Sequence, residues 1–275
     1  MTYQHYTAED GLTLAYRDAG TGLPLIALAG LTRHSGDFDF VAPHLAGVRL
    51  IRPDYRGRGA SDWGDPASYT IEQEARDALR LMDHLDLDKA AFLGTSRGGL
   101  ISMVLAATAK DRLLGVCLND IGPVIEPAGL AGIGAYIGRN PSAKTFEEAA
   151  AGRAKLATGF HGVPEDRWLA DVKNLFTETE DGLVISYDPA LAQTFHAGSG
   201  SEFPPLWPLF DALEGLPLAL IHGANSDILS QATADEMRAR RPDIHYARLD
   251  DRGHVPWLDE PAALAAIRAW LGEMT

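Results

Sequence analysis

The segment Ala90-Ala91-Phe92-Leu93-Gly94-Thr95-Ser96-Arg97-Gly98 decides the fold. Its first five residues predict a buried strand, and a helix of small residues is predicted over about 97–108. Gly-x-Ser-x-Gly stands at their junction. A glycine two places before and another two places after the serine let strand and helix approach closely, so the hydroxyl projects from a tight, strained turn. Ser96 is therefore the candidate nucleophile.

Strand and helix candidates alternate on both sides of this segment. Short apolar runs predict strands over 24–29, 48–51, 90–94, 113–119, 218–221 and 244–249. Helical spacing predicts helices over 38–45, 70–85, 97–108, 231–240 and 257–272. Asp10-Gly11 predicts a hairpin over 3–18, and Thr70 with Gln73 predicts a helix-capping box. This alternation predicts an α/β protein, a mostly parallel sheet with helices on both faces.

The alternation of predicted strands and helices is interrupted between residues 121 and 212. That stretch has helical patterns over 143–157 and 164–177, many Gly and Pro, and no strand alternation. Because strands of the same sheet resume after it, we predict a core of residues 1–120 and 213–275 with a helical cap, or lid, inserted as 121–212.

A serine hydroxyl needs a neighbouring base to act as a nucleophile. His254 lies in a loop between the last predicted strand and the last helix, at the carboxyl edge where Ser96 is also expected. Two carboxylates follow strands at this edge, Asp120 and Asp227. We favour Asp227, because the order Ser, Asp, His with the acid after the insertion is usual. Asp120 remains the alternative, with anchoring of the cap as its other role.

Five motifs match one family in the right order: 29–32, 54–62, 94–98, 223–227 and 253–254. On these motifs the chain resembles the α/β-hydrolase fold superfamily over essentially its whole length. The resemblance implies an eight-stranded sheet with a helical cap inserted after the sixth strand. It also implies an oxyanion hole made by the backbone N–H groups of Leu31 and Arg97. The family more often has His-Gly where this chain has Ala29-Gly30.

The residue type at the nucleophile position narrows the reaction. Epoxide hydrolases and dehalogenases of this family carry Asp there, whereas this chain has Ser96. The resemblance therefore implies hydrolysis of a small-molecule carboxylic ester or lactone through an acyl-enzyme on a Ser-His-Asp triad. Relatives with the same triad cleave carbon–carbon bonds of dienoate ring-fission products or form peracids, and these reactions stay open. A ligand-binding receptor with weak activity is the remaining alternative.

Several side chains are candidates for shaping the substrate site. We predict that Arg33, Trp207 and Trp257 bind substrate. The side chain of Arg97 either favours anionic substrates or pairs with an acidic neighbour, and we favour the pairing. The 54–61 segment is expected to have a structural role, with Arg56 paired to Asp54 or to backbone carbonyls.

The charge composition disfavours two classes of binding partner. The chain has 275 residues, with 38 acidic against 24 basic side chains and a net charge of −14, which disfavours nucleic acid and anionic membranes. The single cysteine, Cys117, allows no internal disulfide and is expected in a buried strand. No signal peptide or spanning segment is visible, so we expect a cytoplasmic protein. No metal-ligand cluster or dinucleotide loop is visible, so we expect no metal and no cofactor; a homodimer remains open.

Overall fold

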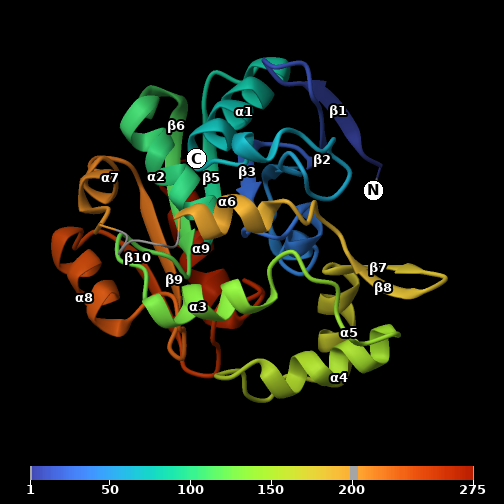
Figure 1. Ribbon diagram of the computed structural model, residues 1–275. Coiled ribbons are helices and arrows are strands. Elements are labelled where there is room, and N and C mark those ends of the chain that lie inside the picture. Colours follow the sequence, from blue (N-terminus) through green and yellow to red (C-terminus); the bar gives the residue numbers. More distant parts are fainter. Residues whose placement is uncertain (1, 199–203, 275) are drawn as a thin grey trace.

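A computed structural model describes residues 2–198 and 204–274 of the chain. One sheet runs through the molecule in the order β1-β2-β4-β3-β5-β6-β9-β10 (Figure 1). The strands are β1 (Gln4–Thr7), β2 (Thr13–Gly20), β3 (Leu23–Leu28), β4 (Val48–Pro53), β5 (Ala90–Thr95), β6 (Leu113–Asn119), β9 (Leu218–Gly223) and β10 (His245–Leu249). β2 pairs antiparallel with β1 and β4, and the other pairs are parallel. The eight-stranded, mostly parallel sheet is therefore confirmed.

The helices of the core are α1 (Ile71–His84), α2 (Arg97–Thr108), α7 (Trp207–Asp211), α8 (Gln231–Arg240) and α9 (Pro261–Gly272). Thr70 caps α1 by accepting from the Gln73 N–H at 3.2 Å, as predicted, although the Gln73 side chain donates to Asp77 instead of completing the box. The continuous helix predicted over 38–45 is wrong. Two short 3₁₀ turns, η1 (Ser35–Phe38) and η2 (Ala42–His44), stand there, because Pro43 lacks the N–H that a continuing helix needs.

Helices cover both faces of the sheet, as the neighbours of strand β6 show. A Cβ on Gly115 of β6 would lie 3.0 Å from Trp270 Nε1 of α9, whereas the Leu118 side chain approaches Gly99 of α2. Residues three apart on a strand point to opposite faces. α2 and α9 therefore sandwich β6 between them.

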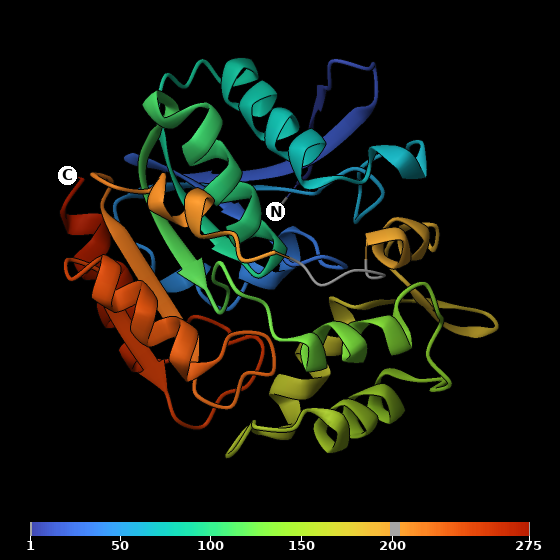
Figure 2. The ribbon, with the colours of Figure 1, turned by 60° about the vertical axis from the view of Figure 1, so that its left-hand side comes forward.

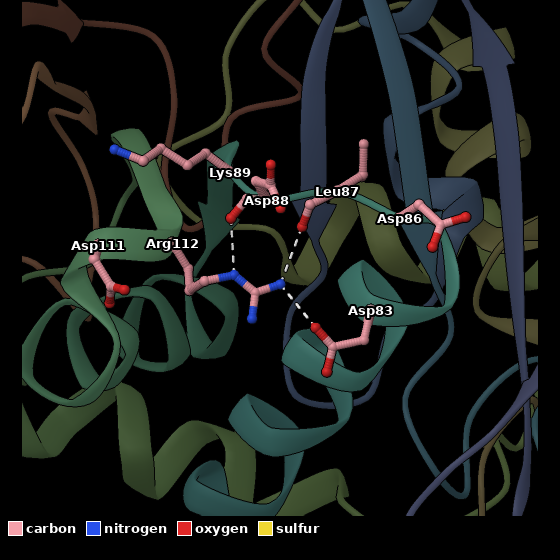
Figure 3. A pocket seen from close by; sticks show the side chains of 7 residues that line it. All are labelled: Asp83, Asp86, Leu87, Asp88, Lys89, Asp111 and Arg112. Atoms are coloured by element: carbon pink, nitrogen blue, oxygen red, sulfur yellow. Dashed lines mark hydrogen bonds and ion pairs between the residues drawn. The ribbon is translucent and has the colours of Figure 1, made fainter.

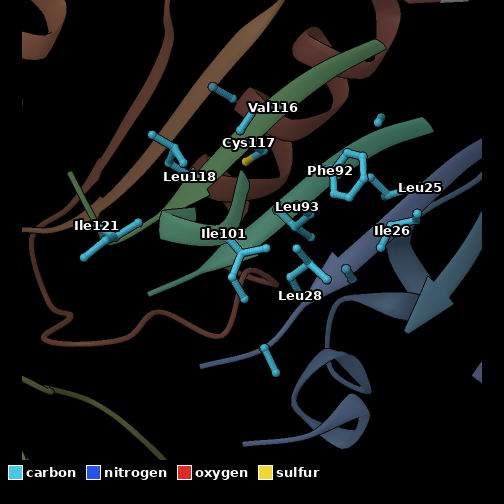
Figure 4. Close-up of a cluster of buried hydrophobic side chains, with 14 of the residues drawn as sticks. Leu25, Ile26, Leu28, Phe92, Leu93, Ile101, Val116, Cys117, Leu118 and Ile121 are labelled. Atoms are coloured by element: carbon cyan, nitrogen blue, oxygen red, sulfur yellow. The ribbon is translucent and has the colours of Figure 1, made fainter. Parts of the chain in front are cut away.

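The apolar core lies between these layers (Figure 4). Its central strands bury almost every residue, as predicted for parallel strands covered on both faces. Cys117 of β6 is fully buried among them, in accordance with its interpretation as a core residue.

The segment between β6 and β9 contains most of the remaining elements, namely α3 (Pro127–Tyr136), α4 (Phe146–Leu156), α5 (Glu165–Lys173), β7 (Phe176–Thr179), β8 (Gly182–Ile185) and α6 (Leu191–Gly198). Figure 2 shows these elements, which we call the cap elements, lying beyond the carboxyl ends of the strands. The helix predicted over 164–177 ends earlier, because β7 and β8 form a hairpin from Phe176 onward. α7 lies inside the predicted 121–212 insertion but packs on α2 of the core, with Phe210 buried there.

Backbone hydrogen bonds are among the contacts that connect the cap elements to the core. Two of these bonds join the loop after β4 to the segment that follows β8. The Gly59 N–H donates to the Ser186 carbonyl, and the Asp188 N–H donates to the Gly57 carbonyl. A further bond runs from His161 N to Asp251 O. None of the described helices is long and apolar enough to cross a bilayer.

Candidate active site

Ser96 occupies a strained turn between β5 and α2. Its φ of 50° and ψ of −114° lie outside the regions that side-chain-bearing residues normally adopt. The two glycines make this turn possible. A Cβ on Gly94 would lie 2.4 Å from the Gly98 carbonyl oxygen, and one on Gly98 would lie 2.1 Å from the Leu28 carbonyl oxygen. Both contacts are too short for any side chain, so the close approach of β3, β5 and α2 requires glycine at both positions.

His254 faces this serine from the loop after β10. Its Nε2 lies 3.0 Å from Ser96 Oγ, and both side chains are partly exposed. The loop is held from within, since Glu260 Oε1 accepts from Arg252 Nε at 2.8 Å. Asn119 Nδ2 also donates to the Pro256 carbonyl at 3.1 Å, which fastens the loop to the end of β6. The imidazole therefore has a fixed place beside the hydroxyl.

Asp120 is the carboxylate at the other side of the imidazole. Its Oδ2 lies 2.8 Å from His254 Nδ1, and its Oδ1 accepts from the Gly223 N–H at 2.8 Å. The side chain is completely buried. Because a carboxylate accepts at Nδ1, the proton belongs on Nδ1 and the lone pair of Nε2 points to Ser96.

The prediction that Asp227 is the partner of His254 is wrong. Asp227 lies in the loop after β9 with an exposed side chain, and its carbonyl accepts from Gly129 N of α3. Asp120 directly follows β6, the strand hydrogen-bonded to β5, and therefore emerges next to the serine turn. A φ of 55° at Asp120 turns the chain there so that the side chain lies under His254.

Comparison with known proteins identifies the family of the chain. A family model described as "Alpha/beta hydrolase family" matches residues 25–267. A 3-hydroxybutyrate-oligomer hydrolase of Cupriavidus necator is 36% identical over 251 residues, which cover 88% of this chain and 85% of that protein. The chain belongs to the alpha/beta hydrolase family. The prediction of a hydrolase is thereby confirmed.

Two further relatives extend this likeness. The crystal structure of an alpha/beta hydrolase from Novosphingobium aromaticivorans DSM 12444 matches with a TM-score of 0.91 and 36% identity, covering 100% of this chain and 98% of that chain. Esterase YbfF of Escherichia coli is 27% identical over 257 residues, 91% of this chain and 93% of that protein. The similarity thus extends over core and cap elements alike.

The two backbone groups predicted to form an oxyanion hole lie next to the serine of this alpha/beta hydrolase. Arg97 is the first residue of α2, so its N–H has no partner within the helix. A Cβ on Gly30 would lie 4.0 Å from Ser96 Cβ, which places the turn carrying Leu31 beside the hydroxyl. Within the described part of the chain, the Leu31 N–H has no hydrogen-bond partner. Their role as oxyanion donors stays a prediction.

Sequence reasoning missed the side chains that support the Leu31 turn. Arg58 Nε donates to the Leu31 carbonyl at 3.0 Å, and Tyr55 donates to the Ala29 carbonyl at 3.0 Å. Asp54 accepts from the Ser35 N–H at 2.7 Å, just after the turn. The 54–61 segment thus holds the turn in shape, in agreement with its expected structural role. The expected Arg56–Asp54 pair is wrong, because Arg56 pairs with Asp77 and Asp10.

The guanidinium of Arg97 is engaged by other residues of the protein. Its Nε lies 2.6 Å from the Glu74 carboxylate, and its terminal nitrogen donates to the Tyr69 carbonyl at 2.9 Å. Glu74 is fully buried and also pairs with Arg58 at 3.0 Å. The interpretation of Arg97 as an internally paired cation therefore agrees with the structure.

The three predicted substrate-binding residues have different surroundings. Arg33 follows the Leu31 turn and pairs with Asp37 and Asp171. Trp257 is nearly buried and packs against Phe160 and Trp168 of the cap elements. Trp207 lies against Phe210, with the Arg240 guanidinium 4.1 Å above its ring. Substrate binding by these residues stays a prediction.

A surface depression of about 570 Å³ lies elsewhere on the molecule (Figure 3). Lys89 precedes β5 and Arg112 precedes β6, so this depression opens at the amino ends of the strands, opposite Ser96. Arg112 fills its centre with bonds to Asp83 and to the carbonyls of Leu87 and Asp88. Among the described residues, no group of three or more acidic, His or Cys side chains is placed to hold a metal ion.

Proposed function

We propose that this protein is a serine ester hydrolase in which Ser96, His254 and Asp120 form the catalytic triad. The observation that carries the proposal is the continuous chain of contacts Ser96 Oγ–His254 Nε2 at 3.0 Å and His254 Nδ1–Asp120 Oδ2 at 2.8 Å. The buried carboxylate fixes the tautomer that leaves Nε2 free to accept the serine proton.

The first half-reaction follows from this geometry. Ser96 Oγ attacks the ester carbonyl while its proton passes to His254 Nε2, and Asp120 stabilises the resulting imidazolium. The negative carbonyl oxygen of the tetrahedral intermediate receives hydrogen bonds from the N–H groups of Leu31 and Arg97. Each such donor is typically worth about 2.7–4 kcal/mol in the transition state. The intermediate then collapses, the alkoxide leaves with the proton from His254, and an acyl-Ser96 ester remains.

Water completes the cycle at the same residues. His254 takes a proton from water, the hydroxide adds to the acyl carbon, and the second tetrahedral intermediate expels Ser96, which recovers its proton from His254. The products are one alcohol and one carboxylic acid. No group beyond the triad and the two backbone donors is required for this sequence.

The substrate class is proposed from similarity. The Cupriavidus necator relative, 36% identical over 88% of this chain, is named a 3-hydroxybutyrate-oligomer hydrolase. We therefore propose small carboxylic esters as substrates, with short esters formed between hydroxy acids as the first class to test. Small-molecule esters also fit a chain whose net charge of −14 disfavours polyanionic partners.

Labelling and turnover test the proposal together. A fluorophosphonate probe is expected to label the native protein at Ser96, and Ser96→Ala is expected to lose both labelling and hydrolysis of ethyl butyrate. Ser142→Ala, on an exposed serine of the cap segment, is the matched control and should retain both. Equal rates of ester hydrolysis by the native protein and by Ser96→Ala would contradict the proposal.

A further inference from the structure

A buried carboxylate links the cap elements to the turn beside the nucleophile. Asp171 of α5 is 1% exposed, and each of its oxygens carries an arginine. Arg33 donates from a terminal nitrogen to Oδ1 at 2.7 Å, and Arg153 of α4 donates from Nε to Oδ2 at 3.1 Å. We call these three residues the Asp171 cluster. Burial alone raises the pKa of Asp171, but the two guanidinium groups hold it well below its usual range, so the carboxylate stays ionised.

The cluster adjoins the proposed reaction centre. A Cβ on Gly30 would lie 3.3 Å from Arg33 Cγ and 4.0 Å from Ser96 Cβ, so the Arg33 stem and the serine flank the same turn. Trp257, three residues after His254 in the chain, points its Nε1 to Asp171 Oδ1 at 3.5 Å. The Asp171 cluster therefore borders the turn that lies beside Ser96.

Arg153 has donors to offer there. Only its Nε is engaged with Asp171, and the side chain is 37% exposed. Its two terminal nitrogens have no hydrogen-bond partner among residues 2–198 and 204–274. The bond to Asp171 fixes the plane of the guanidinium and leaves the outer fork open. A planar fork of this kind matches a carboxylate in bidentate geometry.

Tyr136 of α3 provides a neighbouring hydroxyl. Burial raises the pKa of its phenol, Arg153, Arg33 and the Thr32 hydroxyl lower it, and the Asp227 carboxylate raises it, so these four residues lie within electrostatic range of the hydroxyl. The side chain as a whole is nevertheless 52% exposed. Tyr136 therefore combines an exposed side chain with a hydroxyl in electrostatic range of Arg153 and Arg33.

We propose that the outer fork of Arg153, with the Tyr136 hydroxyl beside it, binds a free carboxylate on the substrate. The enzyme would then select esters that carry a second, ionised acid group, such as acid-terminated oligomers of hydroxy acids, over neutral esters of the same length. This inference rests on the proposed function, since it describes the far end of a substrate whose ester bond lies at Ser96.

Two substrates of equal acyl length isolate the carboxylate. Monoethyl succinate and ethyl butyrate differ at the far end of a four-carbon acyl chain, where one has a carboxylate and the other a methyl group. Initial rates of both are measured in a pH-stat with wild type, Arg153→Gln, Arg153→Lys and Tyr136→Phe. Arg139→Gln removes an exposed arginine just after the same cap helix α3 and controls for the general loss of positive charge.

The ratio of kcat/KM for the two esters is the readout. Arg153→Gln is expected to lower the ratio of succinate to butyrate hydrolysis about 10- to 100-fold, mainly through KM for the anionic ester. Arg153→Lys should retain part of the preference, Tyr136→Phe should lose a smaller part, and Arg139→Gln should keep the wild-type ratio. If Arg153→Gln fails to fold, the same comparison with Arg153→Lys and Tyr136→Phe decides, since both must lower the ratio.

The outcomes separate this inference from the proposed function. A ratio unchanged in the Arg153 and Tyr136 variants, with hydrolysis still dependent on Ser96, overturns the carboxylate site alone. A ratio lowered equally by Arg139→Gln also overturns it, because long-range charge would then explain the preference. Absence of Ser96-dependent hydrolysis of either ester overturns both proposals.

Discussion

Asp120 Oδ2 lies 2.8 Å from His254 Nδ1 although the two residues are 134 positions apart in the chain. The cap elements lie between them in sequence, so the acid precedes the insertion and the base follows it. The sheet explains how they meet. Asp120 directly follows β6, and His254 follows β10. In the sheet, β6 lies between β5, which leads to Ser96, and β9, which is the neighbour of β10. The carboxylate is thus positioned by the centre of the sheet rather than by a loop.

This placement predicts opposite effects for two similar substitutions. Asp120→Asn is expected to lower kcat roughly 10⁴-fold, because the amide favours the wrong imidazole tautomer and no longer stabilises the imidazolium. Asp227→Asn, on an exposed side chain of the neighbouring loop, should change kcat by less than about 2-fold. Rates are measured with ethyl butyrate at saturating concentration. A larger loss in Asp227→Asn than in Asp120→Asn would return the acid role to Asp227.

The fold could be predicted from the sequence because short patterns of apolar residues and glycines mark the strands and the turn that the structure contains. The apolar runs of β3, β5, β6 and β9 mark buried parallel strands, and Gly94 and Gly98 mark a turn that only glycine permits. Ser96 and His254 follow strands of this sheet, so their approach could be predicted from strand order alone.

The choice between two acids could not be made in this way. Asp120 and Asp227 both follow strands at the same edge, and only the three-dimensional path shows that one is buried under His254 and the other exposed. Side-chain pairs between residues far apart in the chain could not be predicted from the sequence either. The partner of Arg56 is Asp77 rather than Asp54, and Asp171 meets Arg33 at a separation of 138 residues. Such pairs depend on how the cap elements settle on the core, which no local pattern encodes.

The ion pair of Arg97 predicts that this side chain does not select the substrate. Its guanidinium is held by Glu74 and by the Tyr69 carbonyl, so it is not available to a ligand carboxylate. Arg97→Met is expected to leave the ratio of kcat/KM for monoethyl succinate and ethyl butyrate within about 2-fold of wild type. The free energy of unfolding should nevertheless fall by roughly 3–5 kcal/mol, because buried Glu74 loses a partner. A strong drop in the ratio would show that Arg97 reaches the substrate.

Burial of Cys117 predicts an unreactive thiol. Desolvation in β6 raises the pKa of the thiol far above its usual range, and the side chain has no exposed surface. Since the thiolate is the reactive form, a disulfide reagent such as 5,5′-dithiobis(2-nitrobenzoic acid) should not modify the folded protein at pH 8 and should react with one thiol per chain in urea. Rapid reaction of the folded protein without loss of structure would contradict this placement.

The pairing of Asp171 predicts how stability depends on pH. Arg33 and Arg153 hold its pKa below the usual value of about 3.9, despite the opposing effect of burial. The folded state therefore binds this proton less tightly than the unfolded state does. The stabilisation is complete above about pH 4–5 and is lost as the pH falls from the unfolded pKa toward the folded one. Asp171→Asn is expected to lower the free energy of unfolding at pH 7 by about 3–5 kcal/mol, since it leaves two arginines without their shared carboxylate.

Urea unfolding of wild type and Asp171→Asn at pH 7 and near pH 3 measures this difference. The gap between the two proteins should narrow at the lower pH, because a wild-type unfolded chain then gains the proton that the folded one resists. Asp166→Asn removes an exposed carboxylate of the same helix, α5, and should change stability by less than about 1 kcal/mol at either pH. A gap that stays constant from pH 7 to pH 3 would mean that Asp171 stabilises the junction of cap elements and core through shape and hydrogen bonding rather than through its charge.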